Sequence, residues 1–103
     1  MKLTERLSFE ESKRIVDLGF PIDLEEYACC YVVKPFKQTN WIGGPAQSHN
    51  IGEFVCYEPD NGYHADDLIP APTYAEAIDW LVEQGKMSKV RWNFAKAVTD
   101  ALG

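Results

Sequence analysis

The sequence predicts one α+β domain over residues 1–103, with two or three short antiparallel strands and helices packed on one face. Length is the first reason, because 103 residues suit one hydrophobic core and leave no room for two. Composition is the second, since 46% hydrophobic and 25% charged residues are typical of a folded chain rather than a disordered one. The third is the order of segments, in which helical patterns enclose two stretches rich in β-branched and aromatic residues.

The first helix is predicted over residues 9–18. Ser8 and Glu11 have the spacing of a capping box, in which the Ser8 hydroxyl accepts the Glu11 amide hydrogen and the Glu11 side chain reaches back. Gly19 provides the stop, because glycine takes the left-handed conformation after a helix at no steric cost. Ile15 and Phe20 then form the hydrophobic pair of a Schellman ending.

Two strands are predicted after this helix. Residues 27–33 are rich in β-formers on both faces and predict a largely buried strand, and residues 53–58 predict a second. The connection between them, residues 34–52, is longer than most structureless loops. It therefore either binds something, is disordered, or holds a short strand near Trp41. A turn is expected at residues 59–62.

The second helix is predicted over residues 74–84, after a stiff extended lead through residues 70–72. Thr73 and Glu76 form its capping box, and Gly85 is its expected C′ residue. Helical spacing separates a core-facing stripe from an outer side. The stripe consists of Tyr74, Ile78, Leu81 and Val82, and the outer side of Glu76, Asp79, Trp80 and Glu83.

The C-terminal segment fits both a strand and a helix in part. We expect a short extended piece over residues 89–92, followed by a helix over residues 94–102 with Asn93 as its cap.

Charge is distributed unevenly along the chain. No lysine or arginine occurs between Gln38 and Gly85, but eight carboxylates do, whereas residues 86–103 carry four basic side chains against Asp100 alone. This field, within a net charge of −6, can steer a basic partner and repels a polyanion. We therefore expect a protein partner rather than a nucleic acid.

The most unusual side chain is Trp80, which lies about 160° around the helix from the centre of the apolar stripe. If it is exposed, a tryptophan ringed by carboxylates can anchor a partner that presents arginine or lysine. If it is covered, it packs under the long connection or the C-terminal segment. Trp41 can likewise be either exposed and available to a partner or covered by another segment. The predicted partner-binding residues are Trp80, Glu76, Asp79, Glu83 and Trp41.

An enzyme is the competing hypothesis. His64 lies beside Asp66 and Asp67 in a polar loop, where a carboxylate can orient an imidazole for acid–base work, and Cys56 is a conceivable nucleophile. The alternative is a hydrated acidic loop, because adjacency in sequence does not establish catalytic geometry. We assign no catalytic residue.

Metal and cofactor signatures are weak. The loop around Asp60 fails the EF-hand spacing at Gly62, and the glycines at residues 43–44 lack the P-loop pattern. Cys29 and Cys30 follow no CxxC or Cys/His ligand spacing, so we predict small buried hydrophobic residues there. We therefore expect no metal and no cofactor.

Two sequence segments, one at the end of the first predicted helix and one spanning most of the second, resemble segments of small uncharacterised proteins encoded by bacteriophages and prophages. The segments are Asp17-Leu18-Gly19-Phe20 and Ala71-Pro72-Thr73-Tyr74-Ala75-Glu76-Ala77-Ile78-Asp79-Trp80-Leu81. The resemblance implies a small α+β fold and a mobile-element origin, and it assigns no catalytic residue. The chain departs from those proteins after the helix, where residues 82–85 replace an Arg-Glu-Lys-like ending.

The main functional hypothesis is a non-enzymatic binding or accessory protein of phage or prophage origin that acts through protein–protein contacts. One alternative is a small hydrolase or metal-dependent enzyme that uses the His64 loop, and another is an inhibitor whose acidic segment mimics DNA. Homo-oligomerisation stays open. No stretch approaches the roughly 18 apolar residues of a membrane span and the first residues lack a signal-peptide pattern, so we expect a cytoplasmic protein that does not contact membranes.

Overall fold

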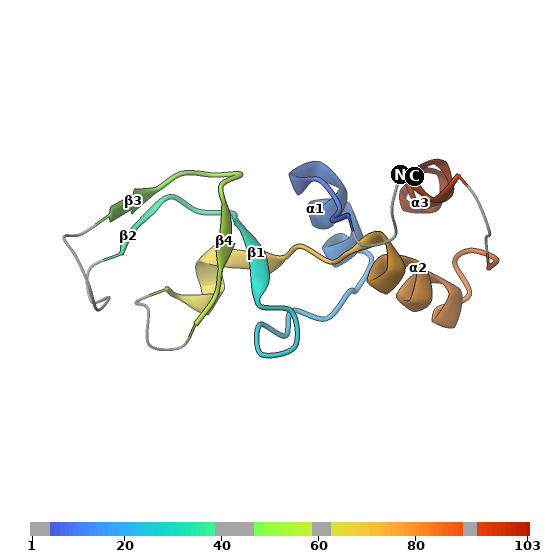
Figure 1. Cartoon of the computed structure of the whole chain (residues 1–103), viewed down its shortest axis with the longest axis horizontal. Coiled ribbons are helices and arrows are strands. Elements are labelled where there is room, and N and C mark those ends of the chain that lie inside the picture. Colours follow the sequence, from blue (N-terminus) through green and yellow to red (C-terminus); the bar gives the residue numbers. More distant parts are fainter. Residues whose placement is uncertain (1–4, 39–46, 59–62, 90–92) are drawn as a thin grey trace. The chain divides into compact units, whose positions relative to one another are not determined.

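The computed structural model describes residues 5–38, 47–58, 63–89 and 93–103. Within these residues the chain is α+β, as predicted, and contains three α-helices and two antiparallel sheets of three and two short strands. It divides into two compact units: a helical unit formed by residues 1–21 and 71–103, and a sheet unit formed by residues 22–70 (Figure 1).

The helical unit begins with α1 (Phe9–Asp17), which ends one residue before the predicted bound and has both predicted end signals. Ser8 and Glu11 form the reciprocal capping box. Gly19 has a φ of 112°, and the Phe20 amide donates to the Ile15 carbonyl at 3.1 Å, which completes the Schellman ending.

Helix α2 (Tyr74–Glu83) also follows its sequence signals. Thr73 and Glu76 form the capping box, and Gly85 has a φ of 71°. The Lys86 amide donates to the Leu81 carbonyl at 2.9 Å, so α2 also has a Schellman ending. The inward side is the predicted stripe with Ala77 added, although Val82 is only partly buried.

Helix α3 (Phe94–Leu102) has the predicted bounds, with Val98 and Leu102 buried. Asn93 occupies the N-cap position, but its φ of 53° is left-handed and its side chain makes no capping hydrogen bond. The expected extended piece over residues 89–92 lies mostly outside the described residues.

Packing within the helical unit joins its first and last segments. Helix α3 contacts both α1 and α2. The Leu7 amide donates to the Pro72 carbonyl at 2.9 Å, and the Tyr74 hydroxyl donates to the Glu11 carboxylate at 3.1 Å. These bonds hold the start of α2 beside the segment around α1.

The sheet unit contains a three-stranded sheet in the order β4-β1-β5, formed by β4 (Phe54–Cys56), β1 (Cys29–Val32) and β5 (Leu68–Pro70). Strands β1 and β4 lie at the centres of the two predicted strands but are shorter. Strand β5 was not predicted, because three residues that end in proline are too few to show an alternating pattern.

The two faces of this sheet differ. Cys30 and Val32 point to one face and pack with Leu24, Val55 and Leu68 in the core of the unit. The other face carries Cys29, Tyr31, Phe54 and Cys56, which are partly buried or exposed. The prediction of a largely buried strand therefore holds for one face of β1 only, because Cys30 and Val32 are buried whereas Cys29 and Tyr31 are partly buried.

Part of the long connection between β1 and β4 forms a second sheet. Strand β2 (Phe36–Gln38) pairs antiparallel with β3 (Gln47–His49), and Phe36 lies opposite His49 (Figure 1). The sequence did not predict this pair because most of its residues are polar. A short 3₁₀ turn, η1 (Ala65–Asp67), precedes β5. The strand considered near Trp41 lies outside the described residues.

Within the described ranges, no helix has the length and apolar character to span a bilayer.

Candidate functional site

Helix α2 carries four of the five residues predicted to bind a partner. We call Glu76, Asp79, Trp80 and Glu83 the Trp80 surface. They recur at helical spacing along one side of α2, and Asp79 and Glu83 are exposed. Glu76 is partly buried and accepts the Thr73 amide hydrogen at 2.8 Å, so its carboxylate is engaged in the cap. The fifth residue, Trp41, lies outside the described residues.

Trp80 is partly buried, and its neighbours come from the end of α1. The Phe20 ring meets the indole edge-on, with ring centroids 5.5 Å apart and an interplanar angle of 67°. A Cβ atom added at Gly19 would lie 3.9 Å from Trp80 Cζ2, so the backbone there also approaches the indole. Among the described residues, the indole is therefore held on one side by the residues that follow α1. Parts of the two segments that the sequence suggested as a cover, residues 39–46 and 90–92, lie outside the described residues.

The charges on this surface are arranged unfavourably for the helix. Asp79 and Glu83 are four residues apart, where like charges repel. Glu83 also lies in the last turn, which contains no basic residue, although the helix dipole favours cations there. Among the described residues, neither carboxylate has an ion pair with lysine or arginine.

The loop proposed for the enzyme alternative contributes mainly backbone contacts. His64 and Asp66 are exposed, and Asp67 is partly buried. The His64 carbonyl accepts the Asp67 amide hydrogen at 3.0 Å, and the Asp67 carbonyl accepts that of Val33 at 2.8 Å. In the described part of the chain, no three His, Cys, Asp or Glu side chains are grouped to hold a metal ion.

A histidine–carboxylate pair does form, but at His49 rather than His64. His49 Nδ1 contacts Glu53 Oε2, and His49 is buried whereas the Glu53 side chain is 44% exposed. The imidazole stacks on Phe36 with ring centroids 4.9 Å apart, and Tyr63 lies 5.4 Å from it. No pattern in the sequence predicted this pair, because it depends on the turn between β3 and β4.

Tyr63 completes this aromatic cluster and has a perturbed hydroxyl. Burial raises the pKa of Tyr63 above its ordinary value, and the negative charges of Glu53, Cys56 and Glu58 raise it further. The phenol therefore stays neutral over a wider pH range. With His49 buried and bonded to Glu53, the cluster is a packed polar–aromatic core for the β2–β3 hairpin.

Two cysteines meet on the partly exposed face of the three-stranded sheet. Cys29 and Cys56 are partners in the β1–β4 register, and their Sγ atoms lie 3.8 Å apart. Cys30 instead points into the core and is fully buried. The prediction of a small buried residue is thus confirmed for Cys30 but wrong for Cys29, because neighbouring residues on a strand face opposite ways.

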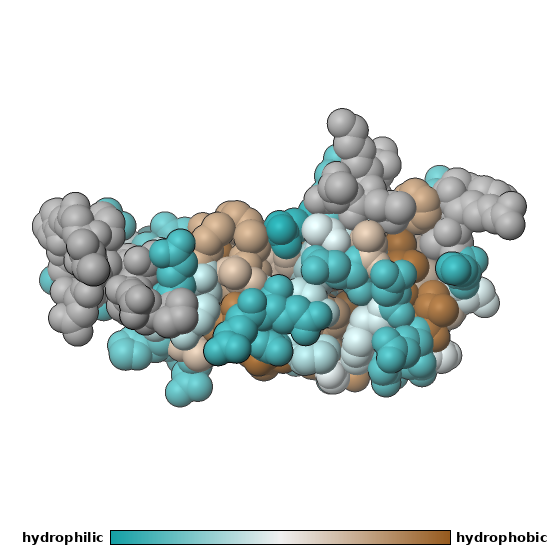
Figure 2. All heavy atoms as spheres, turned by 60° about the horizontal axis from the view of Figure 1, so that its bottom comes forward, coloured by the Kyte–Doolittle hydropathy of each residue, from teal (hydrophilic) through white to brown (hydrophobic). Residues whose placement is uncertain are grey.

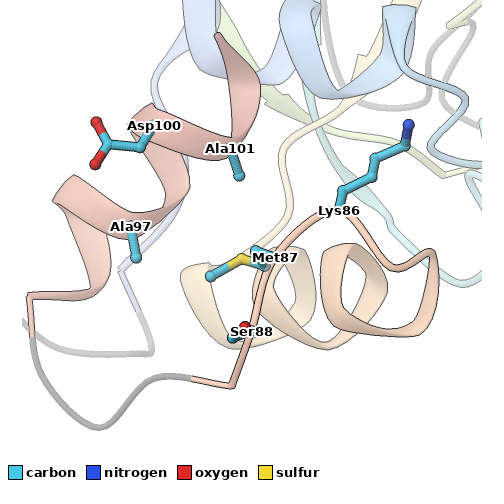
Figure 3. Close-up of a pocket in the computed structure, with 6 residues that line it drawn as sticks. All are labelled: Lys86, Met87, Ser88, Ala97, Asp100 and Ala101. Carbon is cyan, nitrogen blue, oxygen red and sulfur yellow. The ribbon is translucent and has the colours of Figure 1, made fainter.

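The helical unit also has an open hollow of about 290 Å³ between α3 and the segment that follows α2. In Figure 3 the Met87 side chain extends toward α3. The head groups of Lys86 and Asp100 point away from the hollow. Asp100 is bonded to Lys96 at 3.2 Å. Of the lining residues drawn in Figure 3, neither Lys86 nor Asp100 directs its charged head group into the hollow, so the described lining offers mainly apolar contact.

Protein-family models, curated proteins and solved structures were compared with the chain. None matches it.

Figure 2 shows hydrophilic residues over much of the face that it presents, with hydrophobic areas between them. Among the described large hydrophobic residues, the exposed ones are Leu18, Ile22, Ile51 and Phe54.

Of the sites above, the Trp80 surface combines a held aromatic ring with carboxylates that lack ion pairs to described residues. That combination suits contact with a cationic group.

Proposed function

We propose that this chain is a non-enzymatic binding protein that engages a basic segment of another protein through the Trp80 surface. A phage or prophage origin and a cytoplasmic setting belong to the same proposal, and they rest on the sequence alone. The partner contributes arginine or lysine side chains, which lie against the indole and between the carboxylates of Asp79 and Glu83.

The observation that carries the proposal is the charge arrangement of α2. Two exposed carboxylates four residues apart repel each other and oppose helix stability by about 0.2–0.5 kcal/mol. Glu83 in the last helical turn is disfavoured by the helix dipole by about 0.3–1 kcal/mol more. Departures from such local rules are expected at functional or strained sites. A bound cation would remove both penalties.

The held position of Trp80 supports the same function. Phe20 packs against one part of the indole, so less side-chain freedom is lost when a partner binds. A cation placed over a tryptophan ring contributes about 0.5–1 kcal/mol at an exposed site and more when water is excluded.

The decisive experiment compares two charge-matched variants. Asp79→Asn/Glu83→Gln removes the two exposed carboxylates of the Trp80 surface, and Glu25→Gln/Glu26→Gln removes two exposed carboxylates elsewhere. Each protein is used to capture partners from bacterial lysate, and the affinity of a captured protein is then measured by calorimetry. We expect the α2 variant to lose about tenfold or more in affinity, a change of about 1.4 kcal/mol. The control variant should keep most of it.

A third variant tests the indole. Trp80→Phe retains a ring beside Phe20, whereas Trp80→Ala also removes packing, so the phenylalanine variant separates binding from folding. We expect Trp80→Phe to bind more weakly while its circular dichroism and urea midpoint stay close to those of the wild type.

Equal affinity of the wild type and the α2 variant would disprove the proposal. Competition between duplex DNA and the captured protein for the same partner site, with no effect of the α2 substitutions, would instead favour the DNA-mimic alternative. Hydrolytic activity abolished by His64→Ala would favour the enzyme.

A further inference from the structure

The second feature of interest is the pair of cysteines on the sheet unit, which is independent of the Trp80 surface. Cys56 is exposed and Cys29 is partly buried, and both are thiols in this structure. They are 27 positions apart in the chain, yet their sulfur atoms are 3.8 Å apart. The fold thus brings together two accessible thiols that the sequence separates.

The strand register makes this pair suitable for a covalent bond. The Tyr57 amide donates to the Ala28 carbonyl, and the Val32 amide donates to the Glu53 carbonyl. Because hydrogen-bonded and non-hydrogen-bonded pairs alternate along an antiparallel ladder, Cys29 and Cys56 form a non-hydrogen-bonded pair. The Cα atoms of such pairs are about 4.5 Å apart, which is within the range of about 4.4–6.8 Å found for disulfides.

We infer that Cys29 and Cys56 form a redox-modification site, at which a low-molecular-weight disulfide such as oxidised glutathione converts the two thiols to an intrachain disulfide. The sulfur atoms must approach by about 1.8 Å to reach the bond length of about 2.0 Å. Rotation about the Cα–Cβ bonds supplies this approach while the strand pairing is kept.

The exchange balances without any other reactant. The Cys56 thiol releases its proton to solvent, and the thiolate attacks one sulfur of the small disulfide, forming a mixed disulfide and releasing one small thiolate. The Cys29 thiol then releases its proton and attacks Cys56 Sγ, forming the Cys29–Cys56 bond and releasing the second small thiolate. The two small thiolates take up the two protons. Two protein thiols are oxidised, and one small disulfide is reduced to two thiols.

The third cysteine provides an internal control. Cys30 is fully buried, and its Sγ contacts the Ala28 carbonyl oxygen at 3.3 Å on the opposite face of β1. It is adjacent to Cys29 in sequence but turned away from Cys56. We therefore expect the small disulfide to leave Cys30 unmodified in the folded protein.

The test incubates the folded full chain with mixtures of oxidised and reduced glutathione, then blocks the remaining thiols and measures the intact mass and a peptide map. For the wild type and for Cys30→Ala we expect the loss of two hydrogen masses and one peptide pair that joins Cys29 to Cys56. Excess reduced glutathione should restore the thiols. The oxidised protein should unfold at higher urea concentration than the reduced protein, because the bond restricts the unfolded chain.

Single variants provide the matched comparison. Cys29→Ser and Cys56→Ser should lose the intrachain bond completely and stop at a mixed disulfide with glutathione. Oxidised glutathione should raise the urea midpoint of the wild type but not those of the two variants. If either cysteine only contributed packing, its substitution would change the midpoint equally with and without oxidised glutathione. A wild type that stops at the mixed disulfide, that bonds through Cys30, or that forms disulfide-linked dimers would overturn the inference.

Discussion

At the scale of single residues, Trp80 shows how two interpretations can each be partly correct. Its place on α2 opposite the apolar stripe predicted an exposed ring, whereas the usual burial of tryptophan predicted a covered one. The structure gives a partly buried indole, because Phe20 reaches it from the end of α1. Helical spacing gives the direction of a side chain but not what another element places beside it.

The titration of Tyr63 gives a residue-scale prediction. Its pKa is raised in the folded protein by burial and by the nearby charges of Glu53, Cys56 and Glu58. On raising the pH, the unfolded chain therefore loses this proton first. The contribution of Tyr63 to the free energy of unfolding is complete below its ordinary value of about 10 and is lost as the pH rises through the higher folded value.

The measurement compares urea midpoints of the wild type and Tyr63→Phe at a pH of about 9 and of about 11. We expect the wild type to lose more stability than the variant between these values. Other groups titrate in both proteins, so their effects cancel in the comparison. The same loss in both proteins would show that the Tyr63 hydroxyl is not perturbed.

At the scale of elements, helix ends were predicted well and short strands poorly. Capping boxes and Schellman endings use residues a few positions apart, so the sequence contains the whole signal for α1 and α2. Strands β2, β3 and β5 have three residues each, and their pairing partners are distant in the chain. Such strands are defined by their hydrogen-bonded neighbours rather than by their own composition.

The candidate sites also differ in how well the sequence predicts them, according to whether their residues share one element. The Trp80 surface was predicted because its residues share one helix. The His49–Glu53 pair and the Cys29–Cys56 pair were not, because each depends on chain turns or strand register that the sequence left open. The sequence offers Cys56 as a nucleophile beside His64, whereas the structure places it opposite Cys29.

The end of α2 gives an element-scale prediction. Gly85 has a φ of 71°, and an added Cβ would have no atom within 4 Å. Gly85→Ala should therefore destabilise the protein through backbone conformation alone, by about 1 kcal/mol. Gly85→Asn should cost less, because asparagine tolerates the left-handed region. Urea unfolding measures both values. A stabilised alanine variant would show that Gly85 is part of the helix interior, where alanine is preferred.

At the scale of the whole molecule, the uneven charge should affect association more than folding. The formal charge is −6, and the stretch between Gln38 and Gly85 is purely anionic. Long-range attraction of this kind raises association rates and is screened by salt, while close contacts set dissociation rates.

Binding kinetics with an arginine-rich peptide provide the test. We expect the association rate constant to fall as sodium chloride rises from about 0.05 to 0.5 M. The two charge-matched double variants described above should slow association to a similar extent, because both remove two negative charges. Only Asp79→Asn/Glu83→Gln should also speed dissociation. Equal dissociation rates for the two variants would mean that the peptide binds elsewhere.

The contact between Phe20 and Trp80 affects how a mutational scan of this protein should be interpreted. Phe20 closes the Schellman ending of α1 and also borders the indole of the proposed binding surface. Substitutions at Gly19 or Phe20 would therefore weaken binding by letting the indole turn, without either residue touching the partner. A mutational scan that measures only affinity would assign too many residues to the binding surface. Measuring the stability of each variant as well would separate residues that contact the partner from residues that support the indole.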